Sequence, residues 1–177
     1  MSGPAEIRVS ASVKLEARWD APDEPERGVV LCHPHPLHRG TMLVPLFEAI
    51  TADLLKRSVA VLRFNFRGVG RSTGSHDGGL GEIDDVAAAV NFAEINYPHL
   101  GFGIAGWSFG AGTALRWHAR DRSNHNYVGI APGAVSDPLQ RLPEPELLQP
   151  ARRTIIIGER DQLVSPHVII DYAARVG

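Results

Sequence analysis

A serine flanked by glycines is the strongest sign of chemistry in this sequence. The run Gly106-Trp107-Ser108-Phe109-Gly110 follows an apolar stretch at residues 101–105 and precedes a segment with helical spacing. Between a strand and a helix, a G-x-S-x-G run holds its serine on a sharp turn with the hydroxyl exposed. Ser108 is therefore a candidate nucleophile. A glycine-rich turn that only packs a helix on a sheet is the alternative interpretation.

An acidic residue stands at the end of a later apolar stretch. Residues 154–158 lead directly into Glu159, Arg160 and Asp161. An acid in this position, after the serine in chain order, is where a Ser, Asp, His series has its orienting carboxylate. That carboxylate holds a histidine in one tautomer and stabilises the imidazolium. Asp161 is the candidate acid, and an ordinary surface turn is the alternative.

Histidines and prolines alternate after the apolar stretch at residues 28–32, in the run His33-Pro34-His35-Pro36. In a serine hydrolase on such a sheet, this loop supplies one backbone N–H of the oxyanion hole. The residue after the nucleophile, here Phe109, supplies the other. Proline has no N–H, so the loop donor is His35 or Leu37. We expect His33 to be a buried, hydrogen-bonded histidine that braces the loop.

The same loop offers a metal-binding alternative. An H-x-H pair can bind zinc, so His33, His35 and His38 are conceivable ligands. No Asp or Glu accompanies the triplet nearby, and two prolines constrain the rings. We therefore expect no metal.

A double-glycine turn follows the apolar stretch at residues 58–64. It reads N-F-R-G-V-G-R-S from Asn65 to Ser72, and we expect its glycines to serve the backbone. It has neither a G-K-[ST] nor a G-x-G-x-x-G pattern, so we expect no nucleotide cofactor. We expect its two arginines to form ion pairs with nearby acids: Arg67 and Arg71 with Asp77, Glu82 or Asp84.

The elements that position these residues alternate between strand and helix. Apolar runs predict strands at residues 28–32, 58–64, 101–106, 127–131 and 154–158, and helical spacing predicts helices around 46–54, 83–90, 114–117 and 165–176. Strands hydrophobic on both faces belong to a parallel sheet covered by helices. The alternating stretch 12–19 predicts an edge hairpin strand. We expect an α/β, doubly wound, mostly parallel sheet, with the Pro-rich loop 132–150 in the position of a minimal lid.

Composition and charge exclude several classes of partner. The chain has 177 residues and a formal net charge of −2, with 44% hydrophobic and 21% charged residues. Such a balance does not favour nucleic acid or an anionic membrane. No apolar run approaches the roughly 20 residues of a membrane span, and residues 1–9 lack a signal peptide's apolar core. Cys32 is the only cysteine, which excludes an internal disulfide. We expect one cytoplasmic domain spanning 1–177 that acts on a small molecule.

Together these motifs resemble the α/β-hydrolase superfamily, and within it the small, dienelactone-hydrolase-like bacterial members. The resemblance extends from about residue 28 onward. It implies that Ser108 is the nucleophile and Asp161 the acid, with an oxyanion hole near His35 and Phe109. The implied activity is hydrolysis of a small ester, thioester or lactone through an acyl-serine intermediate, without a cofactor. The family's loop usually has a Gly pair after H-P-H-P, whereas residues 38–40 here are His-Arg-Gly.

The catalytic histidine is the main departure from the family. There it follows one more helix and one more strand after the acid, whereas only 16 residues follow Asp161 in this sequence. The chain is thus expected to be C-terminally short of the base. His167 falls in the first turns of the last helix, His118 lies on the helix after Ser108, and His99 precedes the strand before it. His35 and His76 are nearer the expected mouth of the site, but neither is in the family's place for a base.

Two hypotheses remain open from the sequence. The chain is either a serine hydrolase of the esterase type, or a catalytically impaired or truncated relative with a binding or partner role. The second hypothesis predicts an exposed sheet edge or an uncovered apolar face, and with it either a homodimer or a marginally stable chain.

Overall fold

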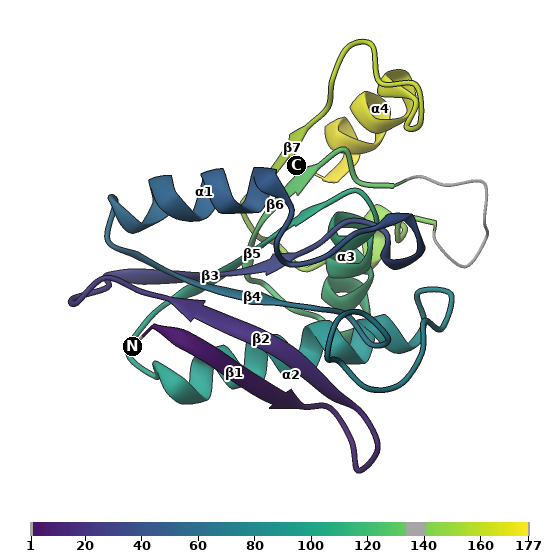
Figure 1. Cartoon of the computed structure of the whole chain (residues 1–177). Helices are drawn as coiled ribbons and strands as arrows, with labels where there is room; N and C mark the ends of the chain where they lie inside the picture. The colour runs from purple at the N-terminus through teal and green to yellow at the C-terminus, as the bar shows by residue number, and fades with distance from the viewer. Residues whose placement is uncertain (1, 134–140, 177) are drawn as a thin grey trace.

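One seven-stranded sheet with helices on both faces organises the chain (Figure 1). The computed structural model describes residues 2–133 and 141–176. The strand order is β1-β2-β4-β3-β5-β6-β7. The first two pairings, β1 with β2 and β2 with β4, are antiparallel, and the other four are parallel. The expected doubly wound, mostly parallel sheet is confirmed.

The strands and helices follow the predicted order. The strands are β1 (Gly3–Arg8), β2 (Lys14–Asp20), β3 (Arg27–Cys32), β4 (Val59–Phe64), β5 (Phe102–Trp107), β6 (Asn126–Ile130) and β7 (Arg153–Ile156). The helices are α1 (Pro45–Leu55), α2 (Gly81–Asn96), α3 (Phe109–Asp121) and α4 (Pro166–Val176), with short 3-10 turns at Pro36–His38 and Pro145–Leu147.

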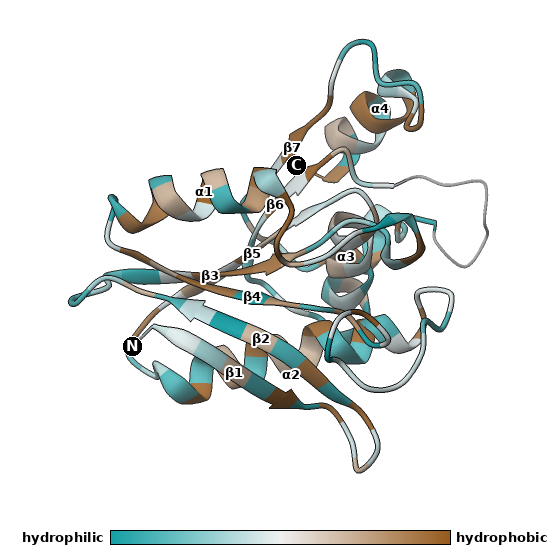
Figure 2. Cartoon of the chain, in the orientation of Figure 1, coloured by the Kyte–Doolittle hydropathy of each residue, from teal (hydrophilic) through white to brown (hydrophobic). Residues whose placement is uncertain are grey.

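The core lies on both faces of the central strands. Along β3, Val30 and Cys32 face the cluster that includes α2 and α3, whereas Leu31 joins Phe47 of α1 and Val61 on the other side. Alternate residues of a strand point to opposite faces, so both faces of this sheet must be covered by apolar helices. Figure 2 shows the resulting run of hydrophobic residues along the central strands.

The N-terminal hairpin differs from the expectation. Residues 12–19 were expected to form the edge strand, but the strand found there, β2, is internal, between β4 and a further strand, β1. The prediction missed β1 because its segment is short and contains Pro4. An edge strand tolerates a proline, since one side of its backbone is not needed for pairing.

The C-terminal helix packs less against the sheet than the other three helices do. Within the described residues β7 forms the second edge of the sheet, and α4 lies beyond it, beside the 3-10 turn at Pro145–Leu147 (Figure 1). The predicted last helix is confirmed. Residues 134–140 of the expected lid loop lie outside the described residues. In the part of the chain that the structure describes, no helix is long and apolar enough to cross a bilayer.

Candidate active site

Ser108 occupies a sharp turn between β5 and α3. Its backbone has φ 52° and ψ −116°, a left-handed conformation that is strained for a residue with a Cβ. Its N–H donates to the Ile130 carbonyl at 2.8 Å, and its carbonyl accepts from the N–H groups of Gly112 at 3.0 Å and Gly133 at 3.2 Å. These bonds fasten the turn to the end of β6. The predicted strand–turn–helix setting is confirmed.

The glycines of the motif are required by close backbone approach. A Cβ on Gly110 would collide with the carbonyl oxygens of Cys32 and His33, at the end of β3. A Cβ on Gly106 would lie 2.5 Å from the Ala111 nitrogen. The two glycines therefore let α3 begin directly against the sheet, with Ser108 at its amino end.

The loop after β3 brings a second backbone donor to this place. The Leu37 N–H donates to the His35 ring at Nδ1, over 3.2 Å, and the His35 carbonyl accepts from the N–H groups of His38 at 3.0 Å and Gly40 at 3.1 Å. Leu37 is thereby committed to the loop itself, which leaves His35 as the better candidate donor. Phe109 is the first residue of α3, where backbone N–H groups have no partner within the helix.

The surroundings of His35 favour the neutral form of its ring. Burial lowers its pKa, the neighbouring His76 and His38 lower it further, and Glu82 opposes the change. Because Nδ1 accepts from the Leu37 N–H, the neutral ring carries its proton on Nε2. The loop is therefore closed by a hydrogen bond that needs the uncharged imidazole.

His33 is buried and hydrogen-bonded through both ring nitrogens. It is 0% exposed. Its Nδ1–H donates to the Pro34 carbonyl at 2.6 Å, and its Nε2 accepts from the Phe66 N–H at 3.0 Å. Burial lowers its pKa to about 4. Both ring nitrogens are committed, which argues against a ligand role, and among the described residues no group of three or more ligating side chains could hold a metal ion.

Asp161 lies in the loop after β7. One of its carboxylate oxygens, Oδ1, accepts from the N–H groups of Leu163 and Val164, both at 2.9 Å. Its own N–H donates to the Gly158 carbonyl at 3.0 Å. The loop is thus closed on its own carboxylate, which is half-buried at the sheet's carboxyl edge.

A cleft of about 300 Å³ brings the predicted residues together. Its lining includes Ser108, Asp161, His35, His38, Trp107 and Leu163. The Phe109 side chain is buried instead, packed against Phe66. The sequence placed the nucleophile and the acid at one edge because both follow strands of a parallel sheet. That His38 shares the cleft with them was not foreseen.

The remaining histidines considered from the sequence lie elsewhere. His118 is fully buried on α3, whereas His99 and His167 are exposed, the latter in the first turn of α4. None of these three lines the cleft. Among the described residues no histidine is hydrogen-bonded to Ser108 or Asp161. The cleft therefore brings together the candidate nucleophile, the candidate acid and a candidate loop donor, and among the described residues His35 and His38 are the histidines that line it.

The arginines of the double-glycine turn have other partners than expected. Arg67 pairs with Asp85, with Nη2 and Oδ1 2.7 Å apart, and Arg71 pairs with Glu16 at 2.9 Å. The predicted partners of the two arginines were wrong because they were chosen for their nearness in the sequence. Asp85 is one helical turn from Glu82 and faces the loop, whereas Asp84 faces outward and pairs with Arg120 on α3. The predicted glycine turn is confirmed, since Gly68 and Gly70 have φ of 75° and 58°.

One polar pair near the cleft was missed altogether. His76 Nδ1 lies 2.7 Å from Oε1 of Glu82, whose carboxylate is 0% exposed. The sequence placed His76 near the mouth of the site but gave it no partner. The available signal was the spacing of Glu82 and Asp85, two acids one turn apart at the start of a helix.

Comparisons with known proteins agree with this architecture. The sequence pattern of the alpha/beta hydrolase family matches residues 29–175. An uncharacterised protein of Rickettsia prowazekii is 35% identical over 121 residues, which cover 67% of this chain and 51% of that protein. The chain thus spans about half the length of this curated relative.

Two solved structures superpose over nearly the whole chain. A Xanthomonas campestris protein, described as a serine hydrolase without a lid, is 28% identical with a TM-score of 0.82, and the match covers 97% of this chain and 77% of that one. A serine hydrolase homologue from Coxiella burnetii is 26% identical with a TM-score of 0.84, covering 99% and 82%. The chain belongs to the alpha/beta hydrolase family.

Proposed function

We propose that the chain carries the catalytic centre of a serine hydrolase that acts on a small ester, thioester or lactone. The observation that carries this proposal is the common cleft: Ser108 on its strained turn lines it together with Asp161 and His35. Support also comes from the Xanthomonas and Coxiella neighbours, which are described as a serine hydrolase and a serine hydrolase homologue. The volume of about 300 Å³ suits a small acyl group.

The proposed reaction has two steps. Ser108 Oγ attacks the carbonyl carbon and loses its proton, the bond to the leaving oxygen or sulfur breaks, and that atom takes up a proton. Water then hydrolyses the acyl-serine. In both steps the carbonyl oxygen becomes an anion, which the N–H groups of Phe109 and His35 stabilise. Trp107 lines the same cleft and provides an apolar surface for the acyl group.

The proton of Ser108 needs an acceptor in the cleft, and we propose His38. The His35 ring already accepts a hydrogen bond at Nδ1. Within the described residues the His38 ring makes no hydrogen bond, and its one ring contact is with His35, at 4.7 Å between centroids. Asp161 lies on the same cleft and supplies the negative charge that stabilises an imidazolium.

Hydrolysis of p-nitrophenyl acetate by purified variants tests this proposal. Ser108→Ala is expected to lose turnover, and His38→Gln to lower kcat by about 100-fold or more. His99→Gln, which changes an exposed histidine outside the cleft, serves as the matched control. Turnover that survives Ser108→Ala overturns the proposal. Loss with Ser108→Ala but full activity in His38→Gln retains the nucleophile and excludes His38 as the base.

A binding role without turnover is the second candidate function. One observation favours it: no histidine among the described residues is hydrogen-bonded to Ser108 or Asp161. Without a positioned base, a serine is a poor nucleophile at neutral pH. In that case wild-type protein would bind a small ester, detected by a change in Trp107 fluorescence, and would release it unhydrolysed.

A further inference from the structure

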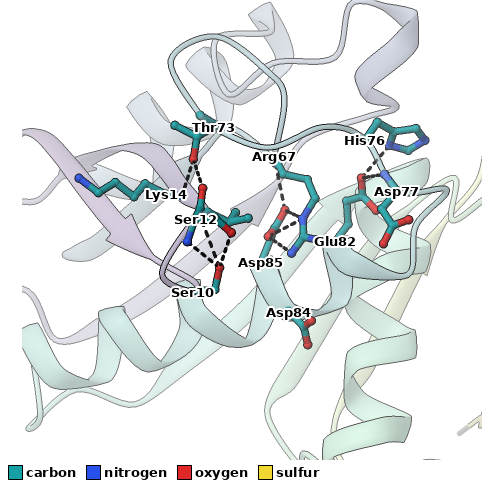
Figure 3. A network of polar contacts seen from close by, with 12 residues as sticks. Ser10, Ser12, Lys14, Arg67, Thr73, His76, Asp77, Glu82, Asp84 and Asp85 are labelled. Atoms are coloured by element: carbon teal, nitrogen blue, oxygen red, sulfur yellow. Dashed lines mark hydrogen bonds and ion pairs between the residues drawn. The ribbon is translucent and has the colours of Figure 1, made fainter.

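The loop that follows β4 is fastened on two sides. Thr73 receives the Lys14 N–H at Oγ1 over 2.9 Å and donates to the Ser12 carbonyl at 3.0 Å, which ties the loop to the β1–β2 hairpin. On the other side Asp85 of α2 accepts from Arg67, from its Nε and Nη2 and from its backbone N–H, at 2.7 to 3.1 Å. Figure 3 shows both attachments. The loop between them is therefore held rigidly against α2.

Glu82 holds the tip of this loop. Its Oε1 accepts from His76 Nδ1 at 2.7 Å and from the Asp77 N–H at 3.0 Å, and its Oε2 accepts from the Gly79 N–H at 2.8 Å (Figure 3). An ionised carboxylate can only accept hydrogen bonds, and backbone N–H groups already donate to both oxygens of the buried Glu82 carboxylate. His76 must therefore carry its proton on Nδ1, which fixes the orientation of its ring.

The fixed ring of His76 contacts the two residues proposed as oxyanion donors. Its centroid lies 5.1 Å from that of His35, with the planes inclined by 55°, and 5.5 Å from that of Phe109, inclined by 60°. The His35 and Phe109 rings also contact each other, at 4.9 Å. His35 comes from the loop after β3 and Phe109 from the start of α3. The His76 ring, which comes from a third segment, therefore contacts both the His35 loop and the start of α3.

We propose that Glu82 and His76 are positioning residues of the oxyanion hole. Glu82 orients the His76 ring, and the ring holds the His35 loop and the first turn of α3 at a fixed separation. This inference rests on the proposed function. Donors stabilise an oxyanion only when they lie about 2.7–3.1 Å from it. A small shift of either backbone N–H therefore reduces the stabilisation of the transition state. Binding of the uncharged substrate does not depend on that distance.

Kinetics with matched variants tests the proposal. His76→Ala removes the ring, His76→Phe keeps a ring but not its bond to Glu82, and Glu82→Gln removes the carboxylate. We expect kcat for p-nitrophenyl acetate to fall at least about 10-fold in His76→Ala and Glu82→Gln, and less in His76→Phe, with KM unchanged. His167→Ala, an exposed histidine on α4, is the control. Wild-type kcat in folded His76→Ala or Glu82→Gln overturns the proposal.

A second readout does not depend on turnover. Backbone amide resonances of His35 and Phe109 are expected to shift in His76→Ala and His76→Phe, and not in His167→Ala. If wild-type protein hydrolyses no ester, the proposed function fails, but these resonances still decide whether His76 positions the two donors. Unchanged His35 and Phe109 resonances overturn the proposal. If His76→Ala does not fold, the ring-retaining His76→Phe supplies both readouts.

Discussion

Ser108 exposes its hydroxyl because its backbone is held where side chains are disfavoured. Three backbone hydrogen bonds, from Ser108 to Ile130 and from Gly112 and Gly133 to Ser108, fix this conformation. The sequence motif predicted the sharp turn, since G-x-S-x-G removes the Cβ atoms that would obstruct it. What the motif did not contain is the surroundings of the hydroxyl, most of which come from loops more than 50 residues away on either side.

The strain at Ser108 is measurable without any substrate. Ser108→Gly and Ser108→Ala both remove the hydroxyl, but only glycine tolerates φ 52° freely. We expect Ser108→Gly to be more stable than Ser108→Ala by about 1 kcal/mol in the free energy of unfolding. Urea denaturation of the two variants checks this. Equal stability would mean that the turn stores no strain.

His33 and Arg67 show which residue roles the sequence allows one to predict. His33 follows an apolar strand and precedes a proline, and the structure shows it buried with both ring nitrogens hydrogen-bonded. The partner of Arg67 was predicted incorrectly, because it depends on which face of α2 turns toward the loop. The three acids near the start of α2 differ in the side of the helix on which they lie. Glu82 and Asp85 face the loop, whereas Asp84 faces outward.

At the scale of elements, the contact between α3 and β3 sets the geometry of the site. Gly110 brings the first turn of α3 against the carbonyls that end β3, just before the loop with His35. The two proposed oxyanion donors are therefore neighbours because these two elements touch.

Gly110→Ala tests this packing. The added methyl group would overlap the Cys32 carbonyl and must push α3 away from β3. Overpacking of this kind costs about 1–3 kcal/mol, and here we expect the upper part of that range because the obstacle is backbone. Thermal unfolding gives the stability, and ester turnover should fall with it. Gly101→Ala is a suitable control, because nothing lies near a Cβ at that position. If Gly110→Ala matches this control, the close packing is not required.

The parallel strands were predicted more reliably than the hairpin. Continuous apolar runs identified β3 to β7, because strands covered on both faces show no polar alternation. β1 carries exposed residues and Pro4, so its sequence differs little from that of a loop. Its place at the edge follows from pairing with β2, a tertiary fact that the local sequence does not contain.

At the scale of the whole molecule, two buried histidines link stability to pH. Burial lowers the pKa of His33 to about 4 and that of His118 to about 3. Below their ordinary value of 6.5 the unfolded chain gains protons that the folded chain does not accept. Stability is therefore undiminished above pH 6.5 and falls as the pH drops toward 4.

His118→Leu separates the two contributions. Neither ring nitrogen of His118 reaches a partner at hydrogen-bonding geometry within the described residues, so the substitution sacrifices no such bond. Each histidine should reduce the free energy of unfolding by about 2 kcal/mol between pH 7 and pH 5. His118→Leu should therefore lose about 2 kcal/mol less than wild type over this interval, measured by urea denaturation. An identical loss in both proteins would show that His118 titrates normally.

Within the residues that the structure describes, β7 is an unpaired edge strand, which bears on assembly. Ile156 of β7 and Val128 of β6 are exposed, and Leu163, beside the cleft, is 95% exposed. Exposed apolar residues beside an unpaired edge favour association. A homodimer through this edge stays a prediction, which sedimentation of wild type against Ile156→Lys would test. Self-association that is unaffected by Ile156→Lys would place the contact elsewhere.

The central claim is that Ser108 is an activated nucleophile in a formed oxyanion hole. Intact-mass analysis after treatment with a fluorophosphonate tests it most directly, since the probe attaches to a serine only when its hydroxyl can attack. We expect wild-type protein to gain the mass of one probe, located by peptide mapping at Ser108, and Ser108→Ala to gain none. Unlabelled wild type, or equal labelling of both proteins, would contradict the account.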